Sequence, residues 1–162
     1  MNIEADFVSY QERVNRLLED CLSNPSPLSK PLNDAMCYAV LNGGKRLRPL
    51  FIYILGIALG LPLQDLDHAA CAIELIHAYS LIHDDLPSMD NDDWRRGKPS
   101  CHKQFGEAMA LLAGDSLQAL AFDVLLKAPL QPIKIVKMLK VLAKAAGQWG
   151  MVAGQAMDFS NS

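Results

Sequence analysis

A short stretch of this chain is unusually rich in acids: residues 83–93 read HDDLPSMDNDD. Carboxylates this close together repel one another unless a cation lies between them. Pro87 ends any helix that reaches it, so the chain can turn there and bring Asp90 back towards Asp84. Carboxylate oxygens suit Mg²⁺, which usually keeps waters and shares the phosphate oxygens of a substrate. The stretch therefore predicts a metal and phosphate site at Asp84 and Asp90, with a solvated acidic loop as the alternative.

Two adjacent arginines follow the acidic stretch directly, in the segment WRRGKP at 94–99. The guanidinium forks of Arg95 and Arg96 match phosphate oxygens with paired hydrogen bonds, while the aspartates before them would hold a bridging cation. Acids followed by arginines predict a diphosphate site. Ion pairs of Asp92 and Asp93 with the same two arginines remain open as a purely structural alternative.

A second basic element lies upstream, in the segment GGKRLRP at 43–49. Its two glycines let the backbone approach a ligand closely, and Lys45 and Arg48 can converge at the positive end of the helix that follows. The segment is not a GxxxxGKS or GxxxxGKT phosphate loop, because its glycine spacing differs and the final Ser or Thr is absent. It suits a second anion.

Polar residues also recur along one predicted helix before the acids. Ile73, His77, Ser80 and Asp84 follow one another in steps of three and four, so they share one helix face. A polar stripe that begins on an apolar helix and ends in aspartates predicts a cavity wall. For His77, the alternative is a histidine whose hydrogen bonds are satisfied inside the core.

Apolar residues recur in steps of three and four along the whole chain, and alternating β-branched patterns are almost absent. We therefore expect helices to position the residues named above. The predicted fold class is all-α, one compact domain with no strands and about six helices. Glycine and proline breaks place these helices at about 5–22, 28–41, from Pro49, 63–86, 103–126 and 132–157. The last carries Gly147, Gly150 and Gly154 on nearly one face, which favours close helix packing or close approach of a ligand.

Composition narrows the class of function. The formal net charge is −3 and the two signs are mixed along the chain, which argues against a nucleic-acid partner. The longest uncharged run, 49–64, falls short of the roughly 20 apolar residues of a membrane span, so it is interpreted as a buried core helix. The start of the chain shows no export signal, and four separated cysteines fit buried free thiols in a reducing cytoplasm.

Four motifs, in order and in register, resemble those of the trans-prenyl diphosphate synthases, and most of all the bacterial farnesyl diphosphate synthases: GGKRLRP at 43–49, HDDLPSMD at 83–90, RRGKP at 95–99 and GQAMD at 154–158. The resemblance runs over essentially the whole chain. It implies a helical bundle of the isoprenoid synthase type, of which residues 1–162 would be the N-terminal half of a single domain. Such enzymes carry a second aspartate-rich motif and further lysines in a C-terminal half, so this chain alone is expected to be inactive or nearly so.

The resemblance also implies roles for individual residues. Asp84 and Asp90 would bind the Mg²⁺ that bridges an allylic diphosphate, with Asp85 beside them and Arg95 holding the same diphosphate. The diphosphate of isopentenyl diphosphate would be bound by the remaining basic residues and by backbone: Lys45, Arg48, His77, Arg96 and Gly44. Gln155 and Asp158 would belong to a helix that lines the cavity. Tyr79, with Ser80, would limit the product to farnesyl length, although ordinary helix packing also explains Tyr79.

The reaction implied is Mg²⁺-assisted ionisation of dimethylallyl or geranyl diphosphate, followed by addition of isopentenyl diphosphate to give farnesyl diphosphate. The implied partners are these small isoprenoid diphosphates and, for the full-length enzyme, a second copy in a cytoplasmic homodimer. Alternatives are a geranylgeranyl or other short-chain prenyl synthase, a non-catalytic helical subunit, and a metal phosphohydrolase with His83 and Asp84 as an HD pair. The last requires further histidine ligands, and only four histidines are present.

Overall fold

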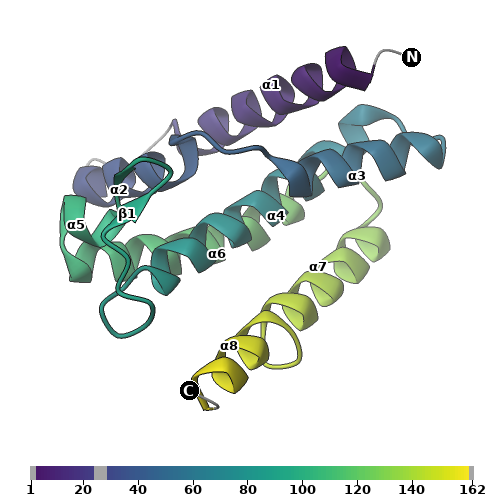
Figure 1. Cartoon of the computed structure of the whole chain (residues 1–162). Helices are drawn as coiled ribbons and strands as arrows, with labels where there is room; N and C mark the ends of the chain where they lie inside the picture. Colours follow the sequence, from purple (N-terminus) through teal and green to yellow (C-terminus); the bar gives the residue numbers. More distant parts are fainter. Residues whose placement is uncertain (1–2, 24–28, 161–162) are drawn as a thin grey trace.

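The computed structural model of the chain describes residues 3–23 and 29–160 and confirms the all-helical class (Figure 1). In chain order the helices are α1 (Ile3–Leu22), α2 (Lys30–Leu41), α3 (Leu47–Ala58), α4 (Leu63–Asp84), α5 (Cys101–Phe105), α6 (Glu107–Leu126), α7 (Pro132–Ala146) and α8 (Met151–Ser160). The second helix was predicted to start at Leu28, which lies outside the described residues. The third begins at Leu47, so Pro49 lies within its first turn and not at its start.

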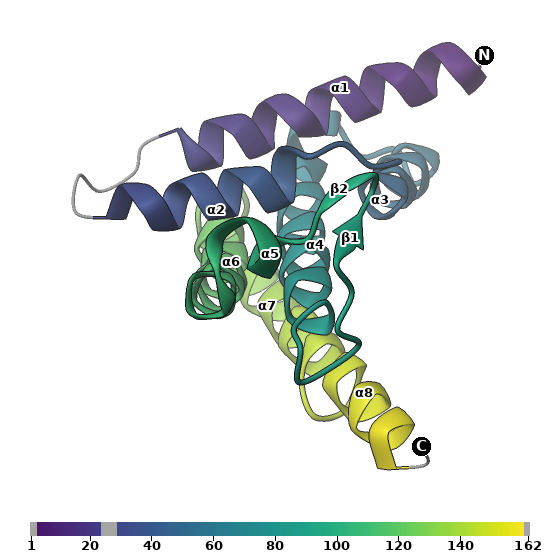
Figure 2. The ribbon, with the colours of Figure 1, turned by 60° about the vertical axis from the view of Figure 1, so that its left-hand side comes forward.

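Helix α4 is the centre of the packing. It contacts α6, α3, α1 and α2, and apolar residues lie all around it because a helix covered on several sides has no solvent face to keep polar. Its most deeply buried apolar side chains include Leu66, Ala70, Cys71, Leu75, Ile76 and Ile82. In the turned view of Figure 2, α1 and α2 lie across α4 and α6, while α7 and α8 extend on the other side.

Two of the predicted helices are interrupted at glycines. The prediction of one helix over 103–126 is wrong, because Gly106 has a φ of +85° and separates α5 from α6. The prediction of one helix over 132–157 is also wrong, since the chain turns at 147–150 between α7 and α8. A Cβ on Gly150 would lie 2.0 Å from the carbonyl oxygen of Ala145, so this glycine serves the turn and not a flat helix face.

A short hairpin follows the acidic stretch, which corrects the expectation that strands are absent. Strand β1 (Trp94–Arg95) pairs antiparallel with β2 (Lys98–Pro99). The residues between them, Arg96 and Gly97, have φ angles of +54° and +77°, as in a turn with left-handed backbone at both central positions. Strands of two residues are too short to show an alternating pattern, so the sequence does not reveal them. The hairpin fixes the backbone of both arginines.

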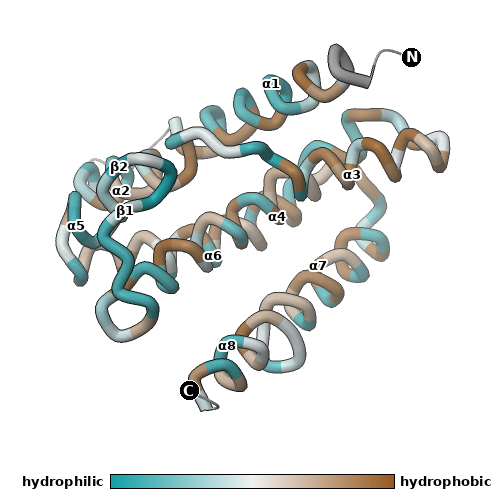
Figure 3. Tube along the Cα trace, in the orientation of Figure 1, coloured by the Kyte–Doolittle hydropathy of each residue, from teal (hydrophilic) through white to brown (hydrophobic). Residues whose placement is uncertain are grey.

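The uncharged run at 49–64 does not form the buried core helix that was predicted. Helix α3 buries Tyr53 and Gly56 but leaves Phe51 and Leu55 exposed, and Figure 3 shows apolar residues along its length. Among the described residues, α6 is the one helix that is long and apolar enough to cross a membrane by length and composition alone. Core helices share this composition, and α6 packs against α4, α2 and α5.

Candidate functional site

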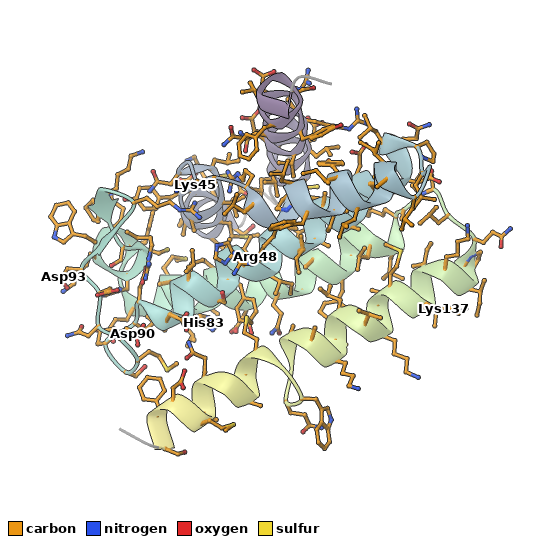
Figure 4. The ribbon with its side chains drawn as sticks, turned by 45° about the vertical axis from the view of Figure 1, so that its right-hand side comes forward. Lys45, Arg48, His83, Asp90, Asp93 and Lys137 are labelled. Carbon is orange, nitrogen blue, oxygen red and sulfur yellow. The ribbon has the colours of Figure 1, made fainter. Side chains whose placement is uncertain are left out.

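The acidic stretch folds into a compact turn at the end of α4. Asp84 is the last residue of the helix, and the backbone N–H of Asp90 donates to its carbonyl oxygen at 2.8 Å. The carbonyl oxygen of Leu86 accepts from the N–H groups of Met89 and Asn91 at 2.9 and 3.1 Å, which closes the turn. Asp90 therefore lies on a loop that returns to Asp84 (Figure 4), as its position after Pro87 predicted.

The carboxyl of Asp84 lies where negative charge is costly. Burial raises its pKa above the ordinary value, and the charges of Asp90 and Asp85 raise this pKa further. The side-chain amide of Gln155, on α8, donates to one Asp84 oxygen and opposes the rise. A cation between the carboxylates would relieve the same repulsion.

Two carboxylates of this turn, those of Asp84 and Asp90, could hold a cation. Within residues 3–23 and 29–160, no group of three or more histidine, cysteine or acidic side chains is arranged to hold a metal ion. Mg²⁺ commonly binds through one or two carboxylates, with waters and substrate phosphate oxygens as its other ligands. The donor set therefore fits Mg²⁺ bound together with a phosphate-bearing ligand.

Arg95 is held beside the acidic turn by a buried acid. Its Nε lies 3.1 and 3.2 Å from the two carboxylate oxygens of Asp85, which is 2% exposed, and its Nη2 reaches Asp92 at 3.4 Å. The hydrogen bond to Asp85 raises the pKa of the Arg95 guanidinium. Asp93 pairs instead with Lys103, at 2.8 Å, so internal ion pairing describes only part of the acid and arginine cluster. About a third of the Arg95 side chain stays exposed and can meet an anion.

Arg96 joins the hairpin to the loop before α3. Its guanidinium donates to the carbonyl oxygen of Gly43 and occupies the space next to Gly44, where an added Cβ would lie 2.7 Å from Arg96 Cζ. Gly44 has a φ of +119°, which side chains rarely allow, and its carbonyl oxygen accepts from the Gln11 amide on α1 at 3.0 Å. The glycines thus let a guanidinium approach the backbone, whereas the sequence suggested a ligand.

A buried charged pair beneath this loop went unnoticed in the sequence. Arg46 has a left-handed φ of +50°, and its side chain donates to Glu74 on α4 at 2.8 Å. The same guanidinium donates to Asn15 on α1 at 2.8 Å and to the Val40 carbonyl oxygen at 2.7 Å. Arg46 and Glu74 are 4% and 2% exposed, so the pair fastens the loop to α1 and α4. The available signal was Glu74 itself, three residues before His77, inside the otherwise apolar stretch 69–76.

His77 and Ser80 share a face of α4, as predicted. With Arg48 they line a cavity of about 110 Å³ whose other wall is α7 and the start of α8. Burial, with a further contribution from the charge of Arg48, lowers the pKa of His77 to about 4, so its imidazole is neutral at pH 7. Lys45 and Arg48 are both exposed near the start of α3 (Figure 4), and their convergence on one anion stays a prediction.

A row of cavities follows α4 away from the acids. A space of about 150 Å³ is lined by Asp84, Tyr79 and Gln155, and it shares Ser80 with the cavity at His77. That cavity in turn shares Ile73 with a mainly apolar space of about 360 Å³ between α3, α4, α6 and α7. Tyr79 is only 6% exposed, so it packs into the core and lines the cavity at once. The row is polar at one end and apolar at the other, which suits a ligand with a charged head and a hydrocarbon tail.

Asp158 and His83 are two further residues that the sequence singled out, and His83 also lines the cavity of about 150 Å³. Asp158 lies on an exposed face of α8, one turn after Gln155. His83 places its Nε2 3.1 Å from the carbonyl oxygen of Leu111 on α6, which counts against a metal pair formed by His83 and Asp84.

Comparisons with known proteins show which proteins the chain resembles. The profile of the polyprenyl synthetase family matches residues 29–162. Farnesyl diphosphate synthase of Haemophilus influenzae is 52% identical over 149 residues, which cover 91% of this chain and 50% of that protein. Geranylgeranyl pyrophosphate synthase 4 of Arabidopsis thaliana is 49% identical over 157 residues, 96% of this chain and 41% of that protein. The chain thus spans about half the length of the curated relatives it matches.

A solved structure shows the same fold. The crystal structure of a geranyltransferase from Legionella pneumophila superposes with a TM-score of 0.92 at 47% sequence identity, covering 96% of this chain and 55% of that one. The matched residues 29–162 include all four motifs. The chain belongs to the polyprenyl synthetase family.

Proposed function

We propose that this chain carries the allylic-diphosphate site of a farnesyl diphosphate synthase, a prenyltransferase that joins an allylic diphosphate to isopentenyl diphosphate. The observation behind the proposal is the row of cavities that begins at Asp84, whose carboxylate interacts with the charge of Arg95, and becomes apolar along α4. A diphosphate head and a prenyl tail fit its two ends. Since the matched relatives are about twice as long, turnover is proposed for a polypeptide that joins residues 1–162, as the N-terminal half of one domain, to the remainder found in those relatives.

Residues of the acidic turn would bind and orient the allylic diphosphate. Asp84 and Asp90 would hold Mg²⁺, which supplies positive charge to the diphosphate when bound. Arg95, fixed by Asp85, would donate to the same diphosphate. These groups stabilise charge that builds up on the departing diphosphate more than charge in the bound ground state. The C–O bond would break towards the diphosphate, and the apolar lining of the space along α4 would disfavour water that could capture the allylic cation.

The second diphosphate is assigned to the loop before α3 and to its neighbours. Lys45, Arg48, His77 and Arg96, with the backbone of Gly44, would bind isopentenyl diphosphate. Neutral His77 can donate one hydrogen bond to a phosphate oxygen. The double bond of isopentenyl diphosphate then attacks the allylic cation, and a proton leaves to the released diphosphate. The product is one isoprene unit longer, with Gln155 and Asp158 on the helix beside it.

Product length is the finer part of the proposal. Tyr79 and Ser80 line the cavities next to Asp84, where bulk would limit the product to farnesyl length. A geranylgeranyl synthase is the second candidate, because the apolar space of about 360 Å³ beyond Ile73 could receive a longer tail. The buried ring of Tyr79 beside the first cavity supports the shorter product.

We further infer that the complete enzyme requires Mg²⁺, forms a homodimer and works in the cytoplasm. The two carboxylates of the acidic turn support the metal requirement. The family resemblance of the four motifs supports the homodimer and the compartment. A non-catalytic subunit would keep the fold but would not need the acids and arginines assembled beside a cavity.

The decisive experiment incubates a polypeptide that extends this chain through the remainder seen in its relatives with radiolabelled isopentenyl diphosphate, geranyl diphosphate and Mg²⁺. Radiolabelled farnesyl diphosphate is the expected product. Its absence would refute the assignment, and geranylgeranyl diphosphate as the main product would select the second candidate. The 162-residue chain, tested in parallel, is expected to form little or no product.

A binding measurement on the 162-residue chain tests the proposed role of the acidic turn. Asp84→Ala should abolish Mg²⁺-dependent binding of geranyl diphosphate, measured by isothermal titration calorimetry. Asp93→Ala is the matched control, because Asp93 is an exposed acid of the same stretch that pairs with Lys103. Equal affinity and equal metal dependence in both variants would show that the acidic turn does not bind the diphosphate.

A further inference from the structure

Two cysteines from distant parts of the chain meet in the packing of α1 against α4. The Sγ atoms of Cys21 and Cys71 lie 3.6 Å apart, although the residues are 50 positions apart in the sequence. Among the described cysteines, Cys37 and Cys101 have no other sulfur at hydrogen-bonding distance. From this contact we propose that Cys21 and Cys71 are an oxidant-sensitive thiol pair that closes to a disulfide between α1 and α4.

The two thiols differ in a way that suits stepwise oxidation. Cys21 is partly exposed, and Cys71 is 1% exposed. The hydrogen bond with Cys71 lowers the pKa of Cys21 against the opposing effect of burial, and the nearby charge of Lys127 adds to the lowering. The same contact and burial raise the pKa of Cys71. Cys21 is therefore the thiolate that an oxidant meets first, and Cys71 is the resolving thiol.

Hydrogen peroxide is small enough to reach the partly exposed sulfur. The Cys21 thiolate attacks one peroxide oxygen, the O–O bond breaks, and hydroxide leaves, which gives a sulfenic acid at Cys21. Cys71 then loses its proton, its sulfur attacks the Cys21 sulfur, and the S–O bond breaks with release of water. Two thiols and one peroxide thus give one disulfide and two waters, with two electrons passing from the thiols to the peroxide.

The disulfide would join the two helices that support the loop before α3, which is proposed to bind isopentenyl diphosphate. On α1, Gln11 donates to the carbonyl oxygen of Gly44 and Asn15 accepts from Arg46. Helix α4 carries Glu74, the other partner of Arg46. A disulfide between α1 and α4 would therefore link covalently the two helices on which the loop rests, and reduction would leave them held by packing alone.

The test treats the reduced chain with hydrogen peroxide, blocks the remaining thiols with iodoacetamide and maps the peptides by mass spectrometry. The expected product is one peptide pair joined at Cys21 and Cys71, lighter by about 2 Da than the two reduced peptides. The oxidised chain should also melt about 5–15 °C higher, because a cross-link over this separation restricts the unfolded chain, and dithiothreitol should reverse the change. Amide hydrogen exchange in α1 should become slower.

Single replacements make the outcome specific. Cys71→Ser and Cys21→Ser should each abolish the cross-linked peptide and the rise in melting temperature, whereas Cys37→Ser, the control at another partly exposed thiol, should retain both. Should Cys71→Ser fail to fold, Cys21→Ser tests the same bond from the more exposed side. Overoxidation of Cys21 without a cross-link, or a cross-link that involves Cys37 or Cys101, would overturn the proposal.

Discussion

Replacement of Glu74 by alanine should strongly destabilise the chain. The side chains of Glu74 and Arg46 are each 3% exposed, and the ion pair between them measures 2.8 Å. Removal of one partner of such a pair typically costs about 3–5 kcal/mol, because the other charge stays buried without an acid. Arg46 would keep its hydrogen bonds to Asn15 and to the Val40 carbonyl oxygen, so we expect the lower end, about 3 kcal/mol. Total stabilities are on the order of 5–15 kcal/mol, so this loss would be easy to measure.

Chemical and thermal unfolding, followed by circular dichroism, measure this loss. A change of about 3 kcal/mol should lower the melting temperature by roughly 6–12 °C in a chain of this size. The matched control is Asp34→Ala, since the pair of Lys30 with Asp34 is exposed and its loss should cost less than about 1 kcal/mol. Joint replacement of Arg46 by methionine and Glu74 by leucine should recover most of the stability, because no charge then stays buried. A Glu74→Ala loss no larger than that of the control would refute the reasoning.

Three further changes test other contacts. Acidification from about pH 6.5 towards pH 4 should destabilise the protein. The pKa of His77 is lowered to about 4 in the folded state, so the unfolded chain takes up the proton first. His77→Asn should remove this part of the pH dependence of thermal unfolding. Gly114→Ala should cost about 1–3 kcal/mol in chemical unfolding, since its Cβ would lie 2.1 Å from the His83 ring, whereas Gly154→Ala, with nothing within 4 Å, should be neutral or slightly stabilising. Tyr79→Ala, in the extended polypeptide, should shift the chromatographed products beyond farnesyl length, and an unchanged product would contradict its role as a stop.

The parts of the fold that the sequence predicts are those set by short-range pattern. Steps of three and four between apolar residues identify helices, because a helix repeats every 3.6 residues. Pro87 cannot continue a helix, so α4 ends before it, at Asp84. The shared face of His77 and Ser80 follows from the same geometry. Each of these features depends on residues within about two helical turns of one another.

The sequence-based predictions of the fold are wrong where the structure depends on packing between segments that are far apart in the sequence. A glycine inside a helical pattern costs only about 1 kcal/mol, so Gly106 and Gly150 look tolerable inside a helix until their surroundings are known. The composition of helix α3 predicts a buried core helix, but the side chains of Phe51 and Leu55 are exposed. Composition states how apolar a helix is, but not which of its sides another helix covers.

The cations of the loop before α3 also show which features local sequence predicts and which depend on tertiary contacts. Residues 45–48 contain three cations, and their order along the chain does not say which one turns inward. Arg46 turns inward because it has a left-handed backbone and meets Glu74 from α4, a residue 28 positions later. Lys45 and Arg48, on either side of it, are left exposed. Local sequence thus identifies the basic loop, and tertiary contacts decide which cations are available for an anion.

The five acids of the opening stretch divide in a similar way, and the division bears on the proposed chemistry. Asp85 is buried and its charge is matched by Arg95, whereas Asp93 pairs with Lys103. Burial raises the pKa of Asp84 most, and repulsion from Asp90 and Asp85 raises this pKa further, while the Gln155 amide and the charge of Arg95 oppose the rise. A divalent cation is the species that would lower this repulsion most. Because Arg95 is already oriented by Asp85, a diphosphate that arrives with the cation would meet a donor held in place, and less side-chain entropy would be lost on binding.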